Sequence, residues 1–388
     1  MTNTPPSLHL SFAEPSGTTD PREIAVEFKA GKARKTVFFR SSGPALRRSG
    51  DALLCLGLVP AMELQCDLVI GSPVDELLFA NIAGIQDLLC AWYPGYRPIV
   101  VVADTHRADY PADRGQAVFF SGGVDSSFSL AEASARLSAI VTVIGADVDP
   151  TASEEVQHLE RTTQAVATAY AMESIRVETD LRRVTDRLVG WVEYHGAVLA
   201  SIGHMLGDRF RTVLIASSAD ESSWSRRWGS HPGLDPLFGA SGLRVEHHGL
   251  VHRLAKIERL LTEPVLMSQL RVCDYAADNC GVCEDCTFML KALAVLDASD
   301  QAPTFQIRNA KTRRLVVTGE GSKSDLAHMR IRALEDELSV DLVKEIGSAM
   351  NWYETKRWIF RFLPLPEMKR KFKRLKRQYR YLRWARQG

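Results

Sequence analysis

The sequence predicts an α/β fold built around a doubly wound parallel sheet, and three observations lead to this prediction. From about residue 116 onward, short apolar runs typical of strands alternate with longer segments of helical periodicity. This alternation is typical of a parallel sheet with helices on both faces. A glycine-rich turn joins the first of these strands to its helix, and four cysteines later fall within fourteen positions. Such a cysteine cluster is expected to form a metal element.

The strands and helices are expected at the following places. Strand-like runs occupy residues 8–12, 36–39, 68–70, 98–104, 117–120, 140–148, 174–180 and 212–218. Segments of helical spacing occupy residues 77–93, 126–137, 153–171, 183–206 and 287–297. Three regions follow from this pattern: an N-terminal α/β unit of unknown role at 1–112, a central domain at 113–298 and a helical region with a basic end at 299–388.

The bulk composition is that of an ordinary globular protein. The chain has 388 residues, of which 45% are hydrophobic and 24% are charged. No run approaches the roughly 20 apolar residues of a membrane-spanning helix. The opening MTNTPPSLHLSFAEPSG lacks the basic and apolar segments of a secretion signal. We therefore expect a cytoplasmic protein, with peripheral attachment to a membrane as an open alternative.

The glycine-rich turn reads SGGVDSS, and its composition suits a phosphate. Gly122 and Gly123 allow backbone angles and close approaches that side chains would block. The N–H groups of the turn and of the first helical turn point to one place, where the helix dipole favours an anion. The serine hydroxyls can donate to phosphate oxygens, whereas Asp125 is expected to act through magnesium or by fixing the loop. The predicted cofactor-binding residues of the loop are Ser121, Gly122, Gly123, Val124, Asp125, Ser126 and Ser127. A capped glycine turn without a ligand is the alternative.

This loop resembles that of the N-type ATP pyrophosphatases, the PP-loop or adenine nucleotide alpha-hydrolase-like family. The family includes the ATP-using domains of asparagine synthetase and GMP synthetase, several tRNA-modifying enzymes and 7-cyano-7-deazaguanine synthase. The resemblance covers about residues 116–296 and implies a shared chemistry. A substrate oxygen attacks the α-phosphate of ATP, pyrophosphate leaves, and a nucleophile such as ammonia or sulfide displaces AMP. The loop is not a Walker A loop, because no Gly-Lys-Ser/Thr follows the glycines.

The same resemblance implies further site residues. It places the adenine near the end of the second strand of the central domain, at Gly145, Ala146 and Asp147. It implies that Lys256, on a later helix, stabilises negative charge on the leaving pyrophosphate, with Arg253 one turn earlier as a weaker candidate. A solvated helix charge is the alternative for Lys256. The candidate catalytic residues are Asp125, Ser126 and Lys256.

The clustered cysteines suit a tetrahedral metal ion. Two consecutive C-x2-C steps, the first with a glycine inside it, supply three thiolates, and a cysteine shortly before them supplies a fourth. Four thiolates can wrap one ion, and a zinc with four protein ligands would be structural. An iron–sulfur cluster and four reduced thiols remain alternatives. The ligand candidates are Cys273, Cys280, Cys283 and Cys286. The element resembles that of 7-cyano-7-deazaguanine synthase-like proteins, whose type of chemistry converts a carboxylate to an amide and then a nitrile. Because Val124 stands where those proteins usually carry glutamine, the resemblance is to the broader group.

A loop-rich stretch near 218–250 is expected to contact the substrate. It combines cationic and aromatic residues at the sheet edge where ligand loops gather, which suits a planar or anionic molecule. The substrate candidates in this stretch are Arg226, Arg227, His231 and Asp235. The end of the third strand of the central domain adds Asp180 and Arg182, and the later helix adds Arg253. A surface excursion shaped by prolines is the alternative. His195 and His204 fall in an apolar helical pattern and are expected to be structural.

These features predict an ATP-dependent ligase of amidotransferase type that uses ATP, magnesium and zinc. It is expected to adenylate a carboxylate or amide oxygen of a small molecule and to transfer the activated group to ammonia or an amine. Two other functions stay open: an RNA-modifying enzyme that thiolates or amidates its substrate, and a nucleotide-binding adaptor without turnover. A homo-oligomer is compatible with the sequence.

The C-terminal tail differs in charge from the rest of the chain. Residues 368–388 hold ten Lys/Arg and no Asp/Glu, so the remainder carries a formal net charge of −9. Within the tail, apolar residues recur at helical spacing: Met368, Phe372, Leu375, Tyr379 and Leu382. Such a helix can lie on an anionic membrane surface, bind RNA or dock an acidic protein. Alternatively, its apolar stripe packs on the protein body and leaves the charges in water.

Overall fold

The computed structural model describes residues 6–13, 20–273, 275–305, 313–362 and 365–387. The protein is an α/β protein with a mostly parallel central sheet, which confirms the predicted class at this level. Part of the opening segment considered for a secretion signal lies outside the described residues. In spatial order the strands of the main sheet are β12 (Arg244–His248), β11 (Phe210–Ala216), β8 (Gly115–Phe119), β9 (Ala139–Ile144), β10 (Glu173–Thr179), β3 (Ala33–Ser41), β2 (Glu23–Ala30), β1 (Leu8–Phe12), β4 (Leu68–Ile70) and β6 (Val101–Val102).

The main sheet is continuous across the first two regions expected from the sequence. Strands β12, β11, β8, β9 and β10 run parallel to their neighbours. Strand β10 then pairs antiparallel with β3, with Thr179 opposite Phe39, and β3, β2 and β1 form an antiparallel meander. Strands β4 and β6 add parallel to β1. A small separate sheet pairs β5 (Val74–Asp75) with β7 (Thr105–His106).

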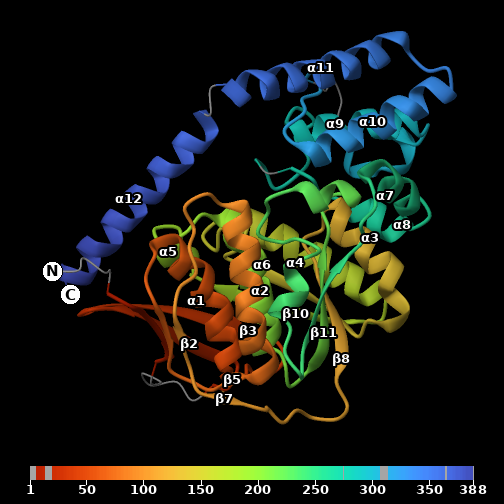
Figure 1. The fold of residues 1–388 in the computed structure, drawn as a ribbon. Helices are drawn as coiled ribbons and strands as arrows, with labels where there is room; N and C mark the ends of the chain where they lie inside the picture. Colours follow the sequence, from red (N-terminus) through yellow and green to blue (C-terminus); the bar gives the residue numbers. More distant parts are fainter. Residues whose placement is uncertain (1–5, 14–19, 274, 306–312, 363–364, 388) are drawn as a thin grey trace.

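Helices cover both faces of this sheet and continue into the C-terminal region (Figure 1). The α-helices are α1 (Gly50–Leu64), α2 (Glu76–Trp92), α3 (Val124–Ala133), α4 (Ser153–Ala169), α5 (Arg182–Thr185), α6 (Trp191–Met205), α7 (Arg253–Leu260), α8 (Pro264–Gln269), α9 (Glu284–Val295), α10 (Glu320–Glu335), α11 (Val340–Phe362) and α12 (Leu365–Gln387). Short 3₁₀ turns are η1 (Ser134–Arg136), η2 (Glu221–Ser225), η3 (Asp235–Phe238), η4 (Ser299–Gln301) and η5 (Pro303–Phe305).

Alternation along the strands sends side chains into two separate cores. Val177 and Ile215 belong to the core that includes α1, α2 and α6. Ile140 and Leu214 point to the opposite face, in the core that includes α3, α4, α7 and α9. Each fully buried aliphatic side chain contributes about 1.5–3 kcal/mol. Burial on both faces leaves the ends of the strands as the places where loops can shape a site.

Helix α1 lies entirely inside the molecule, and two of its residues explain how. An added Cβ at Gly57 would lie 2.7 Å from a side-chain carbon of Leu68, so glycine permits close packing on the sheet. Pro60 lacks an N–H and therefore leaves the carbonyl of Leu56 without its helical donor. The hydroxyl of Tyr194 on α6 donates to that carbonyl at 2.7 Å. The proline is thus accommodated by a partner from the neighbouring helix.

The C-terminal helices pack on different parts of the molecule. Helix α10 contacts α7, α9 and α11, whereas α12 contacts α1, β2 and β3 (Figure 1). Within the described part of the chain, no helix combines the length and apolar character needed to cross a membrane.

Candidate functional site

A cavity of about 440 Å³ opens at the carboxyl ends of the parallel strands. Its walls come from the loops that follow β8, β9 and β11, from the end of β12, and from α6, α7 and the cysteine segment. In open α/β sheets this edge is where ligands bind, because the strand-to-helix loops gather there.

The phosphate loop lines the cavity. Strand β8 ends at Phe119 and α3 begins at Val124, so the turn lies between strand and helix as expected. Gly122 has a φ of +77°, a conformation that other residues rarely adopt. The Ser126 hydroxyl lies 3.2 Å from both the Ser121 amide and the Gly123 carbonyl and thereby fixes the turn.

The start of α3 is open to a ligand. Gly123 is its N-cap residue and makes no side-chain cap bond. The first N–H groups of a helix have no acceptor within the helix, and they carry the positive end of its dipole. Ser121, Gly123, Val124, Asp125 and Ser126 line the cavity. The other two residues predicted for the loop, Gly122 and Ser127, lie behind this surface.

A buried lysine holds the carboxylate of Asp125. Lys256 is only 1% exposed, and its Nζ donates to Asp125 Oδ1 at 2.8 Å and to the Ser217 carbonyl at 2.6 Å. Burial raises the pKa of Asp125, but the charges of Lys256 and Arg253 outweigh it, so the net pKa is lowered. The carboxylate is therefore ionised at neutral pH. Lys256 itself lies beneath the loop and is not among the described residues that line the cavity.

Arg253 lines the cavity with donor capacity to spare. Its guanidinium lies 3.4 Å from Asp125 and 3.5 Å from Asp285, distances too long for strong hydrogen bonds. Its Nε is buried and has no partner among the described residues. Burial lowers the pKa of Arg253, but the charges of Asp125, Asp325 and Asp285 raise it overall. An anionic ligand would satisfy the remaining donors.

The turn after β9 also lines the cavity. Gly145 has a φ of +97°, and an added Cβ would lie 1.8 Å from a carbonyl oxygen of β10, so no other residue fits. Ala146 and Asp147 line the cavity. The Ala146 carbonyl accepts from Arg182 at 2.8 Å, and the Asp147 carboxylate accepts from Trp191 at 2.9 Å. The structure thus brings the predicted adenine segment and the phosphate loop to one cavity.

Arg226 supports the cavity wall through its neighbours. Its guanidinium stacks over Trp228 at 3.8 Å and donates to the Ser218 hydroxyl at 3.1 Å. Trp228 and Ser218 both line the cavity. Burial and the nearby Arg253 lower the pKa of Arg226.

Asp235 is buried and orients a histidine that the sequence analysis did not single out. Its carboxylate lies 2.7 Å from His247 Nδ1 and accepts from the Ser230 hydroxyl at 2.7 Å. Ser230 and His247 line the cavity, and His247 Nε2 is buried without a partner among the described residues. His231 donates its amide N–H to Asp235, while its ring packs edge-on against Trp92. Asp235 and His231 therefore lie behind His247.

Three other substrate candidates lie elsewhere. Asp180 accepts the backbone N–H of Phe38 at 3.0 Å, and Arg182 pairs with Asp186. Arg227 borders a smaller cavity of about 230 Å³ beside α12. In the part of the chain that the structure describes, none of the three lines the main cavity. Their substrate roles stay predictions without geometric support.

Two histidines expected to be structural have different surroundings. His204 is buried, and its Nε2 pairs with the Phe238 carbonyl at 2.8 Å. His195, by contrast, lines the main cavity and lies edge-on to Trp228. Its sequence position on an apolar helix gave no signal for this placement.

The surroundings of His195 predict that the stability of the folded protein depends on pH. Burial lowers the pKa of His195 below 6.5, despite the opposing charges of Asp235 and Asp147, and Arg226 lowers it further. The unfolded chain therefore binds a proton at this residue more readily than the folded chain does, so a fall in pH favours unfolding. The contribution of His195 to the free energy of unfolding is complete above pH 6.5 and is lost as the pH falls below that value. Urea unfolding at pH about 7.5 and about 5.5 should show a smaller decline for His195→Gln than for the wild type. An equal decline in both proteins would contradict the prediction.

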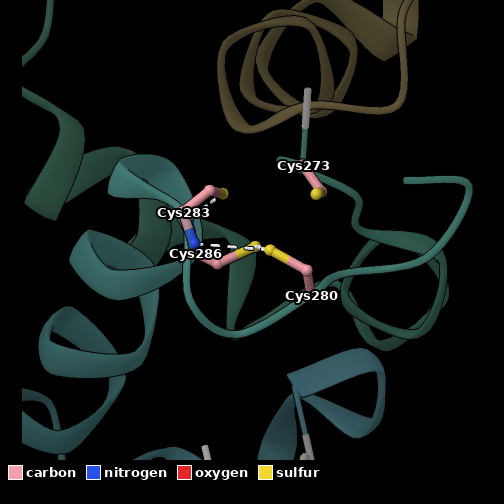
Figure 2. Close-up of side chains that lie close together, drawn as sticks. All are labelled: Cys273, Cys280, Cys283 and Cys286. Carbon is pink, nitrogen blue, oxygen red and sulfur yellow. Dashed lines mark hydrogen bonds between the residues drawn. The ribbon is translucent and has the colours of Figure 1, made fainter. Parts of the chain in front are cut away.

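The four predicted metal ligands converge. All four sulfur atoms lie within 4.8 Å of one another, and Figure 2 shows Cys283 and Cys286 at the start of α9, facing Cys273 and Cys280. Four sulfurs at about 2.3 Å from a tetrahedral zinc would be roughly 3.8 Å apart. The cluster could therefore bind a metal such as zinc.

Backbone donors around the cluster favour thiolates. The amides of Tyr275, Cys283 and Cys286 donate to cysteine sulfurs at 3.3–3.4 Å. Burial raises the pKa of Cys280, but the N–H groups of Val282 and Cys283 lower it to about 7. Burial instead raises the pKa of Cys283 and of Cys286. Since a metal ligand must be deprotonated, binding of an ion at this cluster would release protons.

The cysteine segment is also part of the cavity. Cys273 and Arg271 line it, and the Arg271 amide donates to the Gly122 carbonyl of the phosphate loop at 3.0 Å. Loop, cationic cluster and cysteine element thus form one connected site. Comparisons of the chain with protein-family models, with curated proteins and with solved structures found no match.

Proposed function

We propose that this protein is an ATP-dependent adenylating enzyme whose phosphate loop is the segment from Ser121 to Ser127. The observation that carries the proposal is an uncapped helix N-terminus in the same cavity as Asp125 and Arg253, with Lys256 buried behind Asp125. Backbone donors and a charged arginine with free donors suit a polyphosphate.

Each charged residue has a distinct part in this proposal. Asp125 is ionised and 22% exposed, so it can hold Mg²⁺ together with phosphate oxygens, as magnesium sites in nucleotide enzymes do. Magnesium would neutralise charge on the phosphates. Arg253 would bind the pyrophosphate portion. Lys256, which is buried behind Asp125, would position that carboxylate instead of touching the leaving group itself.

The cavity lining offers groups that suit both parts of the reaction. We place the adenosine at the turn with Ala146 and Asp147, and the acceptor substrate near Trp228, Ser230 and His247. The substrate oxygen attacks the α-phosphorus, the bond to the bridging oxygen breaks, and pyrophosphate leaves. A nitrogen nucleophile then attacks the activated carbon, and AMP leaves. Positioning and charge stabilisation are sufficient for both steps, so no covalent enzyme intermediate is required.

We further propose that the cysteine cluster binds one structural zinc ion. The short sulfur separations favour a single tetrahedral ion over a cluster of several irons. Together with the loop and the parallel sheet, this supports placing the chain near the N-type ATP pyrophosphatases, in particular the 7-cyano-7-deazaguanine synthase-like group.

Product analysis tests the proposed function. With ATP, Mg²⁺ and a panel of small carboxylates and amides, each with ammonia or an amine, we expect AMP and pyrophosphate in equal amounts. Their formation should depend on one class of panel substrate. Release of ADP and phosphate would contradict α-phosphate attack. ATP binding without any AMP across the panel would favour the adaptor function instead.

A further inference from the structure

Helix α12 is fixed to the protein body by one of its faces. The Tyr381 hydroxyl donates to the Pro6 carbonyl at 2.7 Å, and Arg377 pairs with Glu63 at 2.8 Å. Near the start of the helix, Arg370 pairs with Glu193 at 2.8 Å. These contacts determine which side of the helix faces α1 and the sheet, and which side faces outward.

The apolar stripe of α12 is on the outward side. Its members are between 50% and 70% exposed: Leu365, Met368, Phe372, Leu375 and Tyr379. They recur at intervals of three and four residues, which places them on one side of an α-helix. At about 100° per residue, that side lies opposite Arg370, Arg377 and Tyr381. The stripe therefore does not pack on the body.

Basic residues border this stripe. Lys369, Lys373, Lys376 and Arg380 are exposed along one edge of it, and Lys371 is exposed along the other. Of the ten cations in the tail, the ion pairs between described residues use only Arg370 and Arg377. Long lysine side chains beside an apolar stripe can extend their charges toward a polar interface.

We propose that this outward face of α12 binds the surface of an anionic lipid bilayer. The stripe would enter the boundary between headgroups and acyl chains, while the bordering cations meet the lipid charges. A nucleic acid would meet the cations but would leave five large apolar side chains in water. Absence of Asp and Glu from residues 368–388 fits an anionic surface, on which each cation raises affinity by about fivefold. This inference does not depend on adenylation.

Vesicle flotation of the full-length protein tests the proposal. We expect binding to phosphatidylcholine vesicles that contain phosphatidylserine, little binding to phosphatidylcholine alone, and loss of binding as salt rises. The double variant Phe372→Glu/Leu375→Glu should bind at least tenfold more weakly with an unchanged melting temperature, because both side chains are exposed. A matched control is Ile331→Glu/Leu334→Glu on α10, where both residues are 52% exposed, and it should bind like the wild type.

Any of four results would overturn the proposal. The first is no binding to anionic vesicles at low salt. The second is undiminished vesicle binding by the stripe variant. The third is that the wild type is a dimer, does not bind vesicles, and becomes monomeric with Phe372→Glu/Leu375→Glu, since a second copy would then cover the stripe. The fourth is that the wild type binds RNA tightly but not vesicles, and that the stripe variant binds RNA equally well. The partner of α12 would then be RNA and not a lipid surface.

Discussion

Replacing Asp125 with Asn is expected to lower the rate of AMP and pyrophosphate formation by about 10²-fold or more. The substitution keeps the shape of the side chain but removes the charge that contacts Lys256 and is proposed to hold Mg²⁺. Loss of one preorganised charge-stabilising group commonly costs about 10²–10³ in rate. The measurement is the initial rate of pyrophosphate release with the substrate identified from the panel.

Measuring the stability of the Asp125→Asn variant distinguishes a local loss of activity from misfolding. Without the Asp125 charge, Lys256 remains buried with the Ser217 carbonyl as acceptor, and breaking a buried pair costs about 3 kcal/mol. The double variant Asp125→Asn/Lys256→Met should recover part of this loss without recovering activity. Glu132→Gln is the control, because Glu132 lies on the same helix, is partly exposed and pairs with Arg259. A folded Asp125→Asn protein with full AMP formation would refute the site assignment.

Removing the metal is expected to have the largest effect on stability. Cys286 is fully buried, and Cys286→Ser would eliminate one of four ligands. Structural zinc provides about 10 kcal/mol or more in small zinc peptides, and a loss of about 5 kcal/mol lowers the melting temperature by roughly 6 °C in a chain of 388 residues. We expect one zinc per chain in the wild type, less in the variant, and a comparable drop when a strong chelator is added.

The matched control for this experiment is Cys90→Ser. Cys90 lies on α2, is partly exposed and is not a member of the cluster. It should leave metal content and melting temperature unchanged. Iron and sulfide in the purified protein would favour the iron–sulfur alternative, and a metal-free protein of full stability would refute a structural metal. Because Arg271 donates to Gly122, Cys286→Ser should also weaken ATP binding.

The fold could be predicted where local sequence and burial agree. Strands expected at 8–12 and 68–70 coincide with β1 and β4, because the first alternates apolar and polar residues and the second is a short apolar run. Helix α1 was not predicted, because all fifteen of its residues are buried and its sequence has no polar face to reveal a helical period. Gly57 and Pro60 also have low helix propensity, so they argue against a helix here. Their presence is explained by the packing of α1 on the sheet and on Tyr194.

Strand β12 was also missed, for the opposite reason. It is one of the two edge strands of the described sheet, paired only with β11, and its sequence Arg-Val-Glu-His-His is largely polar. Edge strands can carry charged residues because one side faces water. The stretch therefore resembled a loop, and His247 on this strand was not considered for the site.

In the candidate site, too, local motifs could be predicted from the sequence, whereas contacts between distant residues could not. The phosphate loop and the cysteine cluster are local, so residue type and spacing were enough to propose them. The pairing of Asp125 with Lys256 joins residues 131 positions apart, and Asp235 faces His247 only because η3 packs on β12. Contacts of this kind depend on how the sheet is assembled, which no local pattern encodes.

The antiparallel junction between β3 and β10 has a consequence for synthesis of the chain. Its contacts join Phe38 to Asp180, which are 142 residues apart. On the ribosome, the β2–β3 hairpin therefore emerges long before its neighbour exists, with an unpaired strand edge and with Phe39 not yet covered. Contacts between residues this distant in sequence slow folding and prolong the exposure of apolar side chains and unpaired strand edges, which are prone to aggregation. The nascent protein would thus depend on chaperones most strongly after β3 has been synthesised and before β10 is available to pair with it.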